Sequence, residues 1–228
     1  MRTAAILPVK SFARAKQRLG ASVADQLRLE LARAMVSDVL LALSQTAEIE
    51  LTIVVTREPS VAEGALALGA VVVEDESELG QSAAALLGVR RAVEEGIERV
   101  LCVPGDCPAL DPADLAELLA PRPRQDPSVV IVPDRHGTGT NGLLLDPPDA
   151  IEPSFGPGSC ERHRSMAAER GLECRIERLS SLLLDIDTGA DLAALRERLS
   201  DHAGRAARTR SVLDSSQSAG ALAGASLG

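Results

Sequence analysis

Residues 3–9 read TAAILPV, and residues 23–44 read VADQLRLELARAMVSDVLLALS. The first stretch is an apolar run followed by a polar loop, which predicts a buried strand. In the second stretch an apolar residue recurs at every fourth position from Leu27 to Leu43, which predicts a long amphipathic helix. A strand, a loop and a helix in this order form the opening unit of an α/β domain.

The same strand-then-helix pattern occurs three more times. Strands are predicted over residues 51–56, 70–74 and 99–104, and helices over 61–68, 82–95 and 111–119. Regular alternation predicts a mainly parallel sheet with helices on both faces, which is a three-layer, Rossmann-like α/β fold. With 228 residues, of which 45% are hydrophobic, the chain fits one domain, which we expect to span residues 1–202.

A short connection breaks this alternation in the second half of the chain. Strands are predicted over residues 128–133 and 141–145, and the loop between them is too short for a crossover helix, so this pair is antiparallel and the sheet is mixed. Residues 203–228 are rich in Ala, Gly, Ser and Arg without periodicity, and we expect a disordered tail. The remaining predicted elements are a helix over 159–170, a strand over 173–179, a short apolar run over 182–185 that ends like a strand, and a helix over 188–199 capped by Asp187 or Thr188.

Charge and hydropathy exclude several classes of function. The net charge is −9 at pH 7, whereas a nucleic-acid-binding protein needs a basic surface, so we do not expect this chain to bind nucleic acid. The first apolar run is too short for a signal peptide, and no other run reaches the roughly 18 residues of a membrane span. We therefore expect a cytoplasmic protein without a nucleic-acid or membrane partner. The four cysteines and three histidines show no metal-binding spacing, and we expect the cysteines to be reduced.

Ligands of open α/β sheets bind beyond the carboxyl ends of the strands, so the residues after each predicted strand are the site candidates. The loop after the first strand carries Lys10, Arg14, Lys16 and Arg18, and the two lysines are the only ones among 24 basic residues. A lysine ammonium is a compact charge suited to phosphate oxygens. This loop is predicted to neutralise a triphosphate, although a solvated basic loop is the simpler alternative.

Three aspartates follow two other apolar runs. Asp106 lies in the sequence VPGDCP at residues 103–108, and Asp185 and Asp187 lie in DIDT at 185–188. If the second segment is extended, Asp185 and Asp187 point to the same side and can converge on one cation. Mg²⁺ prefers carboxylate and phosphate oxygens, so we predict that it binds here. The alternatives are a turn role for Asp106 and helix capping by Asp187.

Two glycine-rich segments are predicted to bind anions. GTGTNG at residues 137–142 matches the dinucleotide-binding fingerprint literally, but it precedes a strand where that fingerprint requires a helix, so we reject a dinucleotide site. Its backbone N–H groups and threonine hydroxyls suit a small phosphorylated acid instead. FGPGS at residues 155–159 leads into a predicted helix, whose N-terminus attracts anions. DIDT also resembles the opening of dehalogenase-type phosphatases, but too little chain follows it for their catalytic domain.

Five motifs in order resemble the guanylyltransferases that activate 2-phospho-L-lactate or phosphoenolpyruvate for coenzyme F-420. The resemblance spans about residues 4–199. Each motif is weakly specific alone, and their order makes the match specific. The motifs are LPVK at 7–10 with AKQRL at 15–19, PGDCP at 104–108, PDRHGTGTN at 133–141, FGPGS at 155–159 and DIDT at 185–188.

The resemblance implies a nucleotide-diphospho-sugar transferase (GT-A-like) fold, GTP and Mg²⁺ as partners, and a product that passes to a downstream transferase. It implies that the phosphorylated acid is held by Thr140, Gly156 and Ser159. It implies that the metal lies at Asp106, Asp185 and Asp187. Catalysis is assigned to Asp106 with the three cations Lys10, Lys16 and Arg18. The nucleotide is assigned to Pro8, Lys10, Lys16, Arg18, Gly80 and Ser82.

Two features of the sequence bear on specificity. The arginine-rich, lysine-poor composition is typical of a GC-rich genome, and the family branch with such genomes is associated with phosphoenolpyruvate, which we favour over 2-phospho-L-lactate. Where the family commonly has Gly-Leu-Asn, this chain has Gly80-Gln81-Ser82, which changes the groups available to read a base. A transferase for another nucleotide or acceptor, and a non-catalytic nucleotide-binding module, stay open as alternatives. Related molybdopterin and sugar nucleotidyltransferases usually have a glycine-rich first loop, and residues 10–19 contain no glycine.

Overall fold

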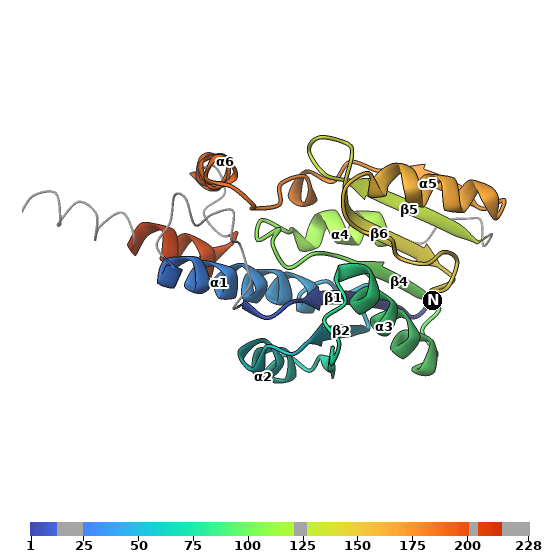
Figure 1. Ribbon diagram of the computed structural model, residues 1–228, viewed down its shortest axis with the longest axis horizontal. Helices are drawn as coiled ribbons and strands as arrows, with labels where there is room; N and C mark the ends of the chain where they lie inside the picture. The colour runs from blue at the N-terminus through green and yellow to red at the C-terminus, as the bar shows by residue number, and fades with distance from the viewer. Residues whose placement is uncertain (13–24, 121–126, 201–204, 216–228) are drawn as a thin grey trace, which may run out of the picture.

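The computed structural model describes residues 1–12, 25–120, 127–200 and 205–215 (Figure 1). Its centre is a seven-stranded sheet with the order β3-β2-β1-β4-β6-β5-β7. The strands are β1 (Thr3–Val9), β2 (Leu51–Thr56), β3 (Val71–Val73), β4 (Arg99–Cys102), β5 (Ser128–Pro133), β6 (Thr140–Asp146) and β7 (Glu173–Ile176).

Strand direction confirms the predicted mixed sheet. β1 pairs in parallel with β2 and β4, β2 with β3, and β5 with β7. β6 is antiparallel to both β4 and β5, as the short connection between β5 and β6 predicts. The carboxyl ends of β1, β2 and β4 therefore lie at the same edge as the start of β6, and this edge carries the candidate site.

Helices cover both faces of the sheet (Figure 1). Helices α1, α2 and α4 pack with one hydrophobic cluster, and α3 and α5 pack with the other. The helices are α1 (Asp25–Ser44), α2 (Pro59–Ala67), α3 (Gln81–Glu94), α4 (Pro112–Leu119), α5 (Ser159–Glu169) and α6 (Gly189–Ser200). The three-layer α/β prediction is confirmed, and the predicted bounds of these six helices agree within two residues.

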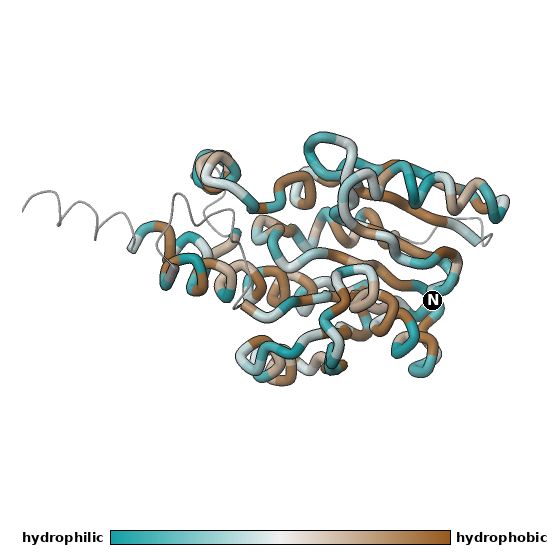
Figure 2. Tube along the Cα trace, viewed as in Figure 1, coloured by the Kyte–Doolittle hydropathy of each residue, from teal (hydrophilic) through white to brown (hydrophobic). Residues whose placement is uncertain are grey.

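Side chains of the central strands alternate between the two faces. In β1, Ala5 and Leu7 contribute to the cluster under α1, whereas Ala4 and Ile6 contribute to the cluster under α3. This alternation is the two-residue period of a strand that is buried on both sides. In Figure 2 the hydropathy colouring shows hydrophobic residues along the central strands and a mixture of hydrophobic and polar residues along the helices.

The chain after β7 differs from the prediction in two places. β7 ends at Ile176, three residues earlier than predicted, and residues 184–187 have no strand pairing. A short 3-10 helix (Ser180–Leu182) comes before them. The prediction of a strand end at 182–185 is therefore wrong, because Leu184 and Ile186 are buried in a third cluster beside α6 instead of joining the sheet edge.

The expectation of disorder from residue 203 onward is wrong for residues 205–215. Residues 207–215 form a helix, and Leu213 is buried in the third cluster with residues of α1 and α6. The buried Asp38 carboxylate on α1 accepts the backbone N–H groups of Arg208 and Thr209 at 3.2 and 2.8 Å. These N–H groups belong to the first turn of the helix, which has no internal acceptors for them. Residues 203, 204 and 216–228 lie outside the described part of the chain.

Two further expectations concern membranes and cysteines. Within the described ranges, no helix is long and apolar enough to cross a membrane. All four cysteines lie in the described part of the chain; none of them forms a disulfide bond there, and three are buried. Burial raises the pKa of the Cys102 thiol to about 12, so this thiol stays protonated and unreactive at neutral pH.

Candidate functional site

The loop after β1 is only partly described. Pro8 lies inside β1 and Lys10 follows its end with an exposed side chain. Lys16 and Arg18, which the sequence assigns to catalysis and nucleotide binding, lie outside the described residues. Two carboxylates hold the backbone just after Lys10, since the N–H of Ser11 donates to Glu78 and the N–H of Phe12 donates to Glu58.

Asp106 and the segment of Asp185 and Asp187 meet at the carboxyl end of β4. The N–H of Ile186 donates to the backbone carbonyl of Asp106 at 3.1 Å. Burial alternates along the segment, with Leu184 and Ile186 buried and the two aspartates half-buried. Such alternation is the pattern of extended backbone, in which Asp185 and Asp187 share one side. We call Asp106, Asp185 and Asp187 the carboxylate group.

Asn141 fixes one member of the carboxylate group. Its side-chain amide donates to the carbonyl of Leu182 at 2.8 Å and to Asp185 Oδ1 at 3.3 Å. Burial raises the pKa of the Asp185 carboxyl, and the negative charges of Asp106 and Asp187 raise it further, against the opposing hydrogen bond from Asn141. The carboxylate group therefore concentrates negative charge that a cation would relieve.

The carboxylate group is not a complete metal cage. Among the residues that the structure describes, no three His, Cys, Asp or Glu side chains are close enough to hold a metal ion together. Mg²⁺ usually binds through one or two carboxylates and completes its shell with substrate phosphates and water. The half-buried carboxylate oxygens of Asp106 and Asp185 fit that mode of binding, and they do not fit a metal bound by protein alone.

The start of α6 holds the segment that contains Asp185 and Asp187 at its C-terminal end. Asp191 Oδ2 accepts the N–H groups of Asp187 and Thr188 at 3.0 and 2.7 Å, and the Thr188 hydroxyl accepts the N–H of Asp191 at 3.3 Å. This is a capping box with Thr188 as the N-cap, so the alternative of capping by Asp187 does not apply. Arg135, from the loop after β5, forms an ion pair with Asp191 at 2.5 Å.

Several interactions compete in setting the pKa of Asp191. Burial alone would raise the pKa of its carboxyl, but the hydrogen bonds from Thr188 and Asp187 and the charge of Arg135 together lower it. The carboxyl is therefore ionised at neutral pH and can accept all of these bonds.

The loop between β5 and β6 is a tight turn that contacts α5. Asp134 Oδ1 accepts the N–H of Thr138 at 3.0 Å, and a Cβ on Gly139 would lie 2.7 Å from Asp134 Oδ2. A larger residue at position 139 would therefore have to displace the Asp134 carboxylate from its bond with Thr138. The carbonyl of Thr138 accepts the N–H of Cys160 at 3.1 Å, which places the loop against the first turn of α5.

Residues 154–159, which we call the cradle loop, lead into α5. Gly156 and Gly158 have φ angles of 107° and 72°, which glycine adopts without strain. Ser159 is fully buried, and its hydroxyl has no hydrogen-bond partner among the described residues. An unpaired polar atom at a helix N-terminus suits an anionic ligand.

His163 joins the cradle loop to Thr140. The ring is fully buried, its Nδ1 lies 3.1 Å from Thr140 Oγ1, and its Nε2 accepts the N–H of Ser154 at 2.8 Å. The Phe155 ring packs edge-on against it with centroids 5.4 Å apart. Burial, helped by the charge of Arg162, lowers the pKa of His163 to about 4, so the ring is neutral at pH 7.

The N-terminus of α3 contacts the cradle loop. Gly80 precedes α3 with a φ angle of 120°, and the Ser82 hydroxyl accepts the N–H of Phe155 at 2.8 Å. Gly80 and Ser82, two of the six residues assigned to the nucleotide, thereby lie at the cradle loop, which contains Gly156 and Ser159 of the residues assigned to the acid.

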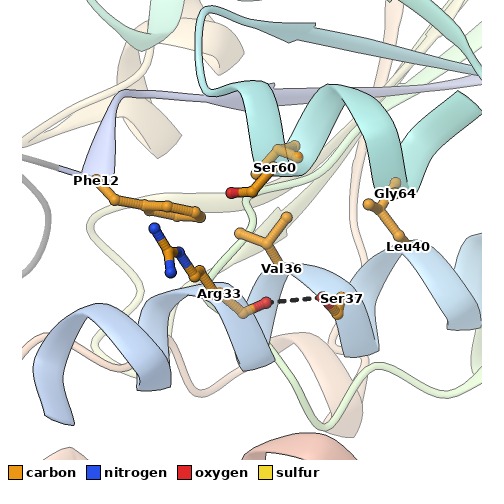
Figure 3. Close-up of a pocket in the computed structure, with 8 residues that line it drawn as sticks. Phe12, Arg33, Val36, Ser37, Leu40, Ser60 and Gly64 are labelled. Carbon is orange, nitrogen blue, oxygen red and sulfur yellow. Dashed lines mark hydrogen bonds between the residues drawn. The ribbon is translucent and has the colours of Figure 1, made fainter. Parts of the chain in front are cut away.

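A separate cavity of about 230 Å³ lies between α1 and α2 (Figure 3). Phe12 and Arg33 face each other at its mouth, with the guanidinium carbon 6.0 Å from the ring centroid. The other residues that line the cavity include Ser37, Leu40 and Ser60. The residues predicted from sequence as site residues do not line this cavity.

Three residues of the site were not predicted from sequence: Asn141, His163 and Asp191. For two of these residues the sequence contains a local pattern that could have indicated them. His163 is four residues after Ser159 and therefore lies on the same face of the predicted helix. Thr188 and Asp191 form the pattern of a capping box. Asn141 left no such signal, because its contact with Asp185 joins two distant segments.

Comparisons with known proteins identify the family of this chain. Residues 3–207 match the family model described as "Guanylyl transferase CofC like". A phosphoenolpyruvate guanylyltransferase of Conexibacter woesei is 50% identical over 94% of this chain and 96% of its own length. A 2-phospho-L-lactate guanylyltransferase of Methanothermobacter thermautotrophicus is 35% identical over 86% of this chain and 84% of its own length.

Solved structures show the same fold. A putative nucleotide-diphospho-sugar transferase from Desulfovibrio desulfuricans aligns with a TM-score of 0.75 at 17% identity, over 96% of each chain. A nucleotidyl transferase from the Methanothermobacter species aligns with a TM-score of 0.60 at 21% identity, over 86% of this chain and 97% of that one. The predicted nucleotide-diphospho-sugar transferase fold is therefore confirmed.

Proposed function

The chain belongs to the family of CofC-like guanylyl transferases, and we propose that it transfers GMP from GTP to the phosphate of phosphoenolpyruvate, with release of pyrophosphate. The relative that shares half of its residues is named for phosphoenolpyruvate, whereas the relative named for 2-phospho-L-lactate shares 35%. This difference favours phosphoenolpyruvate as the acceptor. The product, enolpyruvyl-diphospho-5'-guanosine, would pass to a downstream transferase in the assembly of coenzyme F-420.

One observation carries the proposal: the first two residues of β6 contact two different parts of the site. Thr140 contacts His163 beside the cradle loop, and Asn141 contacts Asp185 of the carboxylate group. The register between β5 and β6 shifts at this point, and the two contacts place the proposed anion-binding and cation-binding parts of the site one residue apart along β6. Two phosphate-bearing substrates that react with each other need this arrangement.

The chemistry that we propose is a substitution at the α-phosphorus of GTP. An oxygen of the acid's phosphate forms a bond to that phosphorus, the bond from it to the β-phosphate's bridging oxygen breaks, and pyrophosphate leaves. The attacking oxygen is already ionised at pH 7, so no side chain has to remove a proton. The residues of the site therefore act by positioning the substrates and by neutralising charge.

We assign the residues as follows. Thr140, Gly156 and Ser159 hold the acid, while Pro8, Gly80 and Ser82 lie on the nucleotide's side. Lys10, with Lys16 and Arg18 of the undescribed loop, neutralises the leaving pyrophosphate. One or two of the carboxylates of Asp106, Asp185 and Asp187 would bind Mg²⁺, and the triphosphate would complete its coordination. When bound, Mg²⁺ would stabilise the negative charge that develops on the α-phosphate.

The product itself tests the proposal. The protein is incubated with Mg²⁺, phosphoenolpyruvate and each of GTP, ATP, CTP and UTP, and the products are identified by mass spectrometry. We expect a guanosine diphospho-enolpyruvate product from GTP only. A faster reaction with another nucleotide would overturn guanine specificity. No product with any nucleotide, although calorimetry shows that GTP binds, would support a non-catalytic nucleotide-binding module.

A further inference from the structure

The two hydrogen bonds of His163 determine which ring nitrogen carries its proton. A backbone N–H can only donate, so Nε2 must be unprotonated to accept the bond from Ser154 at 2.8 Å. The neutral ring then carries its proton on Nδ1, which lies 3.1 Å from Thr140 Oγ1. The ring therefore donates to Thr140 and accepts from Ser154.

This tautomer has a consequence for the Thr140 hydroxyl. A hydroxyl has one proton to donate and two lone pairs that accept. Because Oγ1 accepts the Nδ1–H of His163, its own proton is left for another acceptor. An anionic oxygen is a strong acceptor for such a proton, and bonds to ionised groups are about twice as strong as neutral ones.

We propose that His163 is a positioning residue that fixes the Thr140 hydroxyl as a hydrogen-bond donor to an anionic oxygen of the acid substrate. The same ring holds Ser154, so it also sets the distance between β6 and the cradle loop. The inference rests on the proposed function, since it assumes that an anionic acid binds beside Thr140. The ring itself is fully buried and does not touch the substrate.

The surroundings of the ring favour the neutral form. The ring packs against the edge of Phe155, and the nearest charge on its own helix is the guanidinium of Arg162, which bonds to the carbonyls of Ser154 and Phe155. Burial is the main cause of the lowered pKa, and the Arg162 charge adds to it. A protonated ring would present N–H to the N–H of Ser154, which would break this one of the bonds between the cradle loop and α5.

Two substitutions separate the two bonds of the ring. In His163→Gln the side-chain oxygen reaches the position of Nε2 and accepts from Ser154, but the donor to Thr140 is lost. In His163→Asn the side-chain nitrogen lies near the position of Nδ1 and still donates to Thr140. Ser165→Ala, on the exposed side of α5, is the matched control.

Steady-state kinetics with both substrates varied give the test. We expect His163→Gln to raise KM for phosphoenolpyruvate about tenfold while KM for GTP changes less than about twofold, as expected for one lost hydrogen bond to an anion. His163→Asn should recover part of the loss, and Ser165→Ala should match the wild type. In a Thr140→Val background, His163→Gln should add little. Equal rises in both KM values, or His163→Asn no better than His163→Gln, would overturn the proposal.

A measurement without turnover separates this inference from the proposed function. Nitrogen-15 NMR of the imidazole rings, with His163 assigned by its loss in His163→Gln, should show a protonated Nδ1 and an unprotonated Nε2 at pH 7. The opposite tautomer would overturn the inference even if the enzyme is active. If the wild type turns over no acid but shows the expected tautomer, the proposed function fails and the assignment of the ring's proton stands.

Discussion

The Ser82 hydroxyl accepts the backbone N–H of Phe155 at 2.8 Å, and this bond joins the start of α3 to the cradle loop. Ser82 was assigned to the nucleotide from sequence, and Phe155 belongs to the segment assigned to the acid. One side chain therefore links the two halves of the proposed site. The bond gives this serine a structural task beside any contact with a base.

Replacing Ser82 with alanine should weaken binding of the acid more than binding of GTP. The N–H of Phe155 loses its acceptor, so the cradle loop is held less firmly, and KM for phosphoenolpyruvate should rise by roughly five- to tenfold. Arg90→Gln, on the exposed side of α3, is the control and should leave both KM values unchanged. A rise in KM for GTP alone would mean that Ser82 acts on the nucleotide and not on the cradle loop.

Asp106→Asn should lower kcat by about 100-fold or more while the fold is kept, because the amide removes a charge from the carboxylate group. Asp149→Asn, at an exposed position after β6, is the matched control for the loss of one carboxylate charge. Circular dichroism and thermal unfolding monitor the fold of both variants. Near-normal turnover of Asp106→Asn would remove Asp106 from the proposed chemistry.

Alanine substitutions at Gly88 and at Gly64 should change the free energy of unfolding in opposite directions. A Cβ on Gly88 would overlap the Ile6 side chain and lie 3.2 Å from Val55 Cγ2. We expect Gly88→Ala to lower the free energy of unfolding by about 1–3 kcal/mol. Gly64, in α2, has open space around its Cβ position, and Gly64→Ala should raise the free energy of unfolding by about 1 kcal/mol. Urea titrations of both variants measure the difference, and equal midpoints would contradict the close packing of α3.

Acid should destabilise the protein through His163. At pH 7 the ring is neutral in the folded chain and mostly neutral in the unfolded chain, so it contributes little to the pH dependence there. Between about pH 6.5 and pH 4 the unfolded ring takes up a proton that the folded ring does not, and the free energy of unfolding should fall by up to about 3 kcal/mol. Urea titrations across this range, compared with His163→Gln, isolate the contribution. The same pH slope in both proteins would contradict a neutral, buried His163.

The helices and the central strands could be predicted from the sequence because their periodicities are undisturbed. The four-residue period from Leu27 to Leu43 and the apolar run of residues 3–9 depend only on which side of each element is buried. The C-terminal helix at 207–215 could not be predicted in this way. Its single large buried apolar residue, Leu213, gives no repeating pattern, and its first turn is stabilised by Asp38 from α1.

The residues of the candidate site also differ in how far their positions could be predicted from the sequence. The turn at Asp106 after a strand, the glycines before α5 and the shared side of Asp185 and Asp187 could be predicted because each is a local pattern along the chain. The position of Asp185 and Asp187 beside Asp106 could not, because it depends on a bond from Asn141 and on the bond between Ile186 and Asp106. These contacts join residues that are 44 and 80 positions apart, and no local pattern records them.

Pyrophosphate release is the most direct test of guanylyl transfer to phosphoenolpyruvate. The purified protein is given GTP and Mg²⁺ with phosphoenolpyruvate, 2-phospho-L-lactate or 3-phosphoglycerate, or with no acid. We expect rapid release with phosphoenolpyruvate, slower release with 2-phospho-L-lactate, and none with 3-phosphoglycerate or without an acid. Release that does not depend on an acid, or no release with any of the three while GTP still binds, would contradict guanylyl transfer to phosphoenolpyruvate.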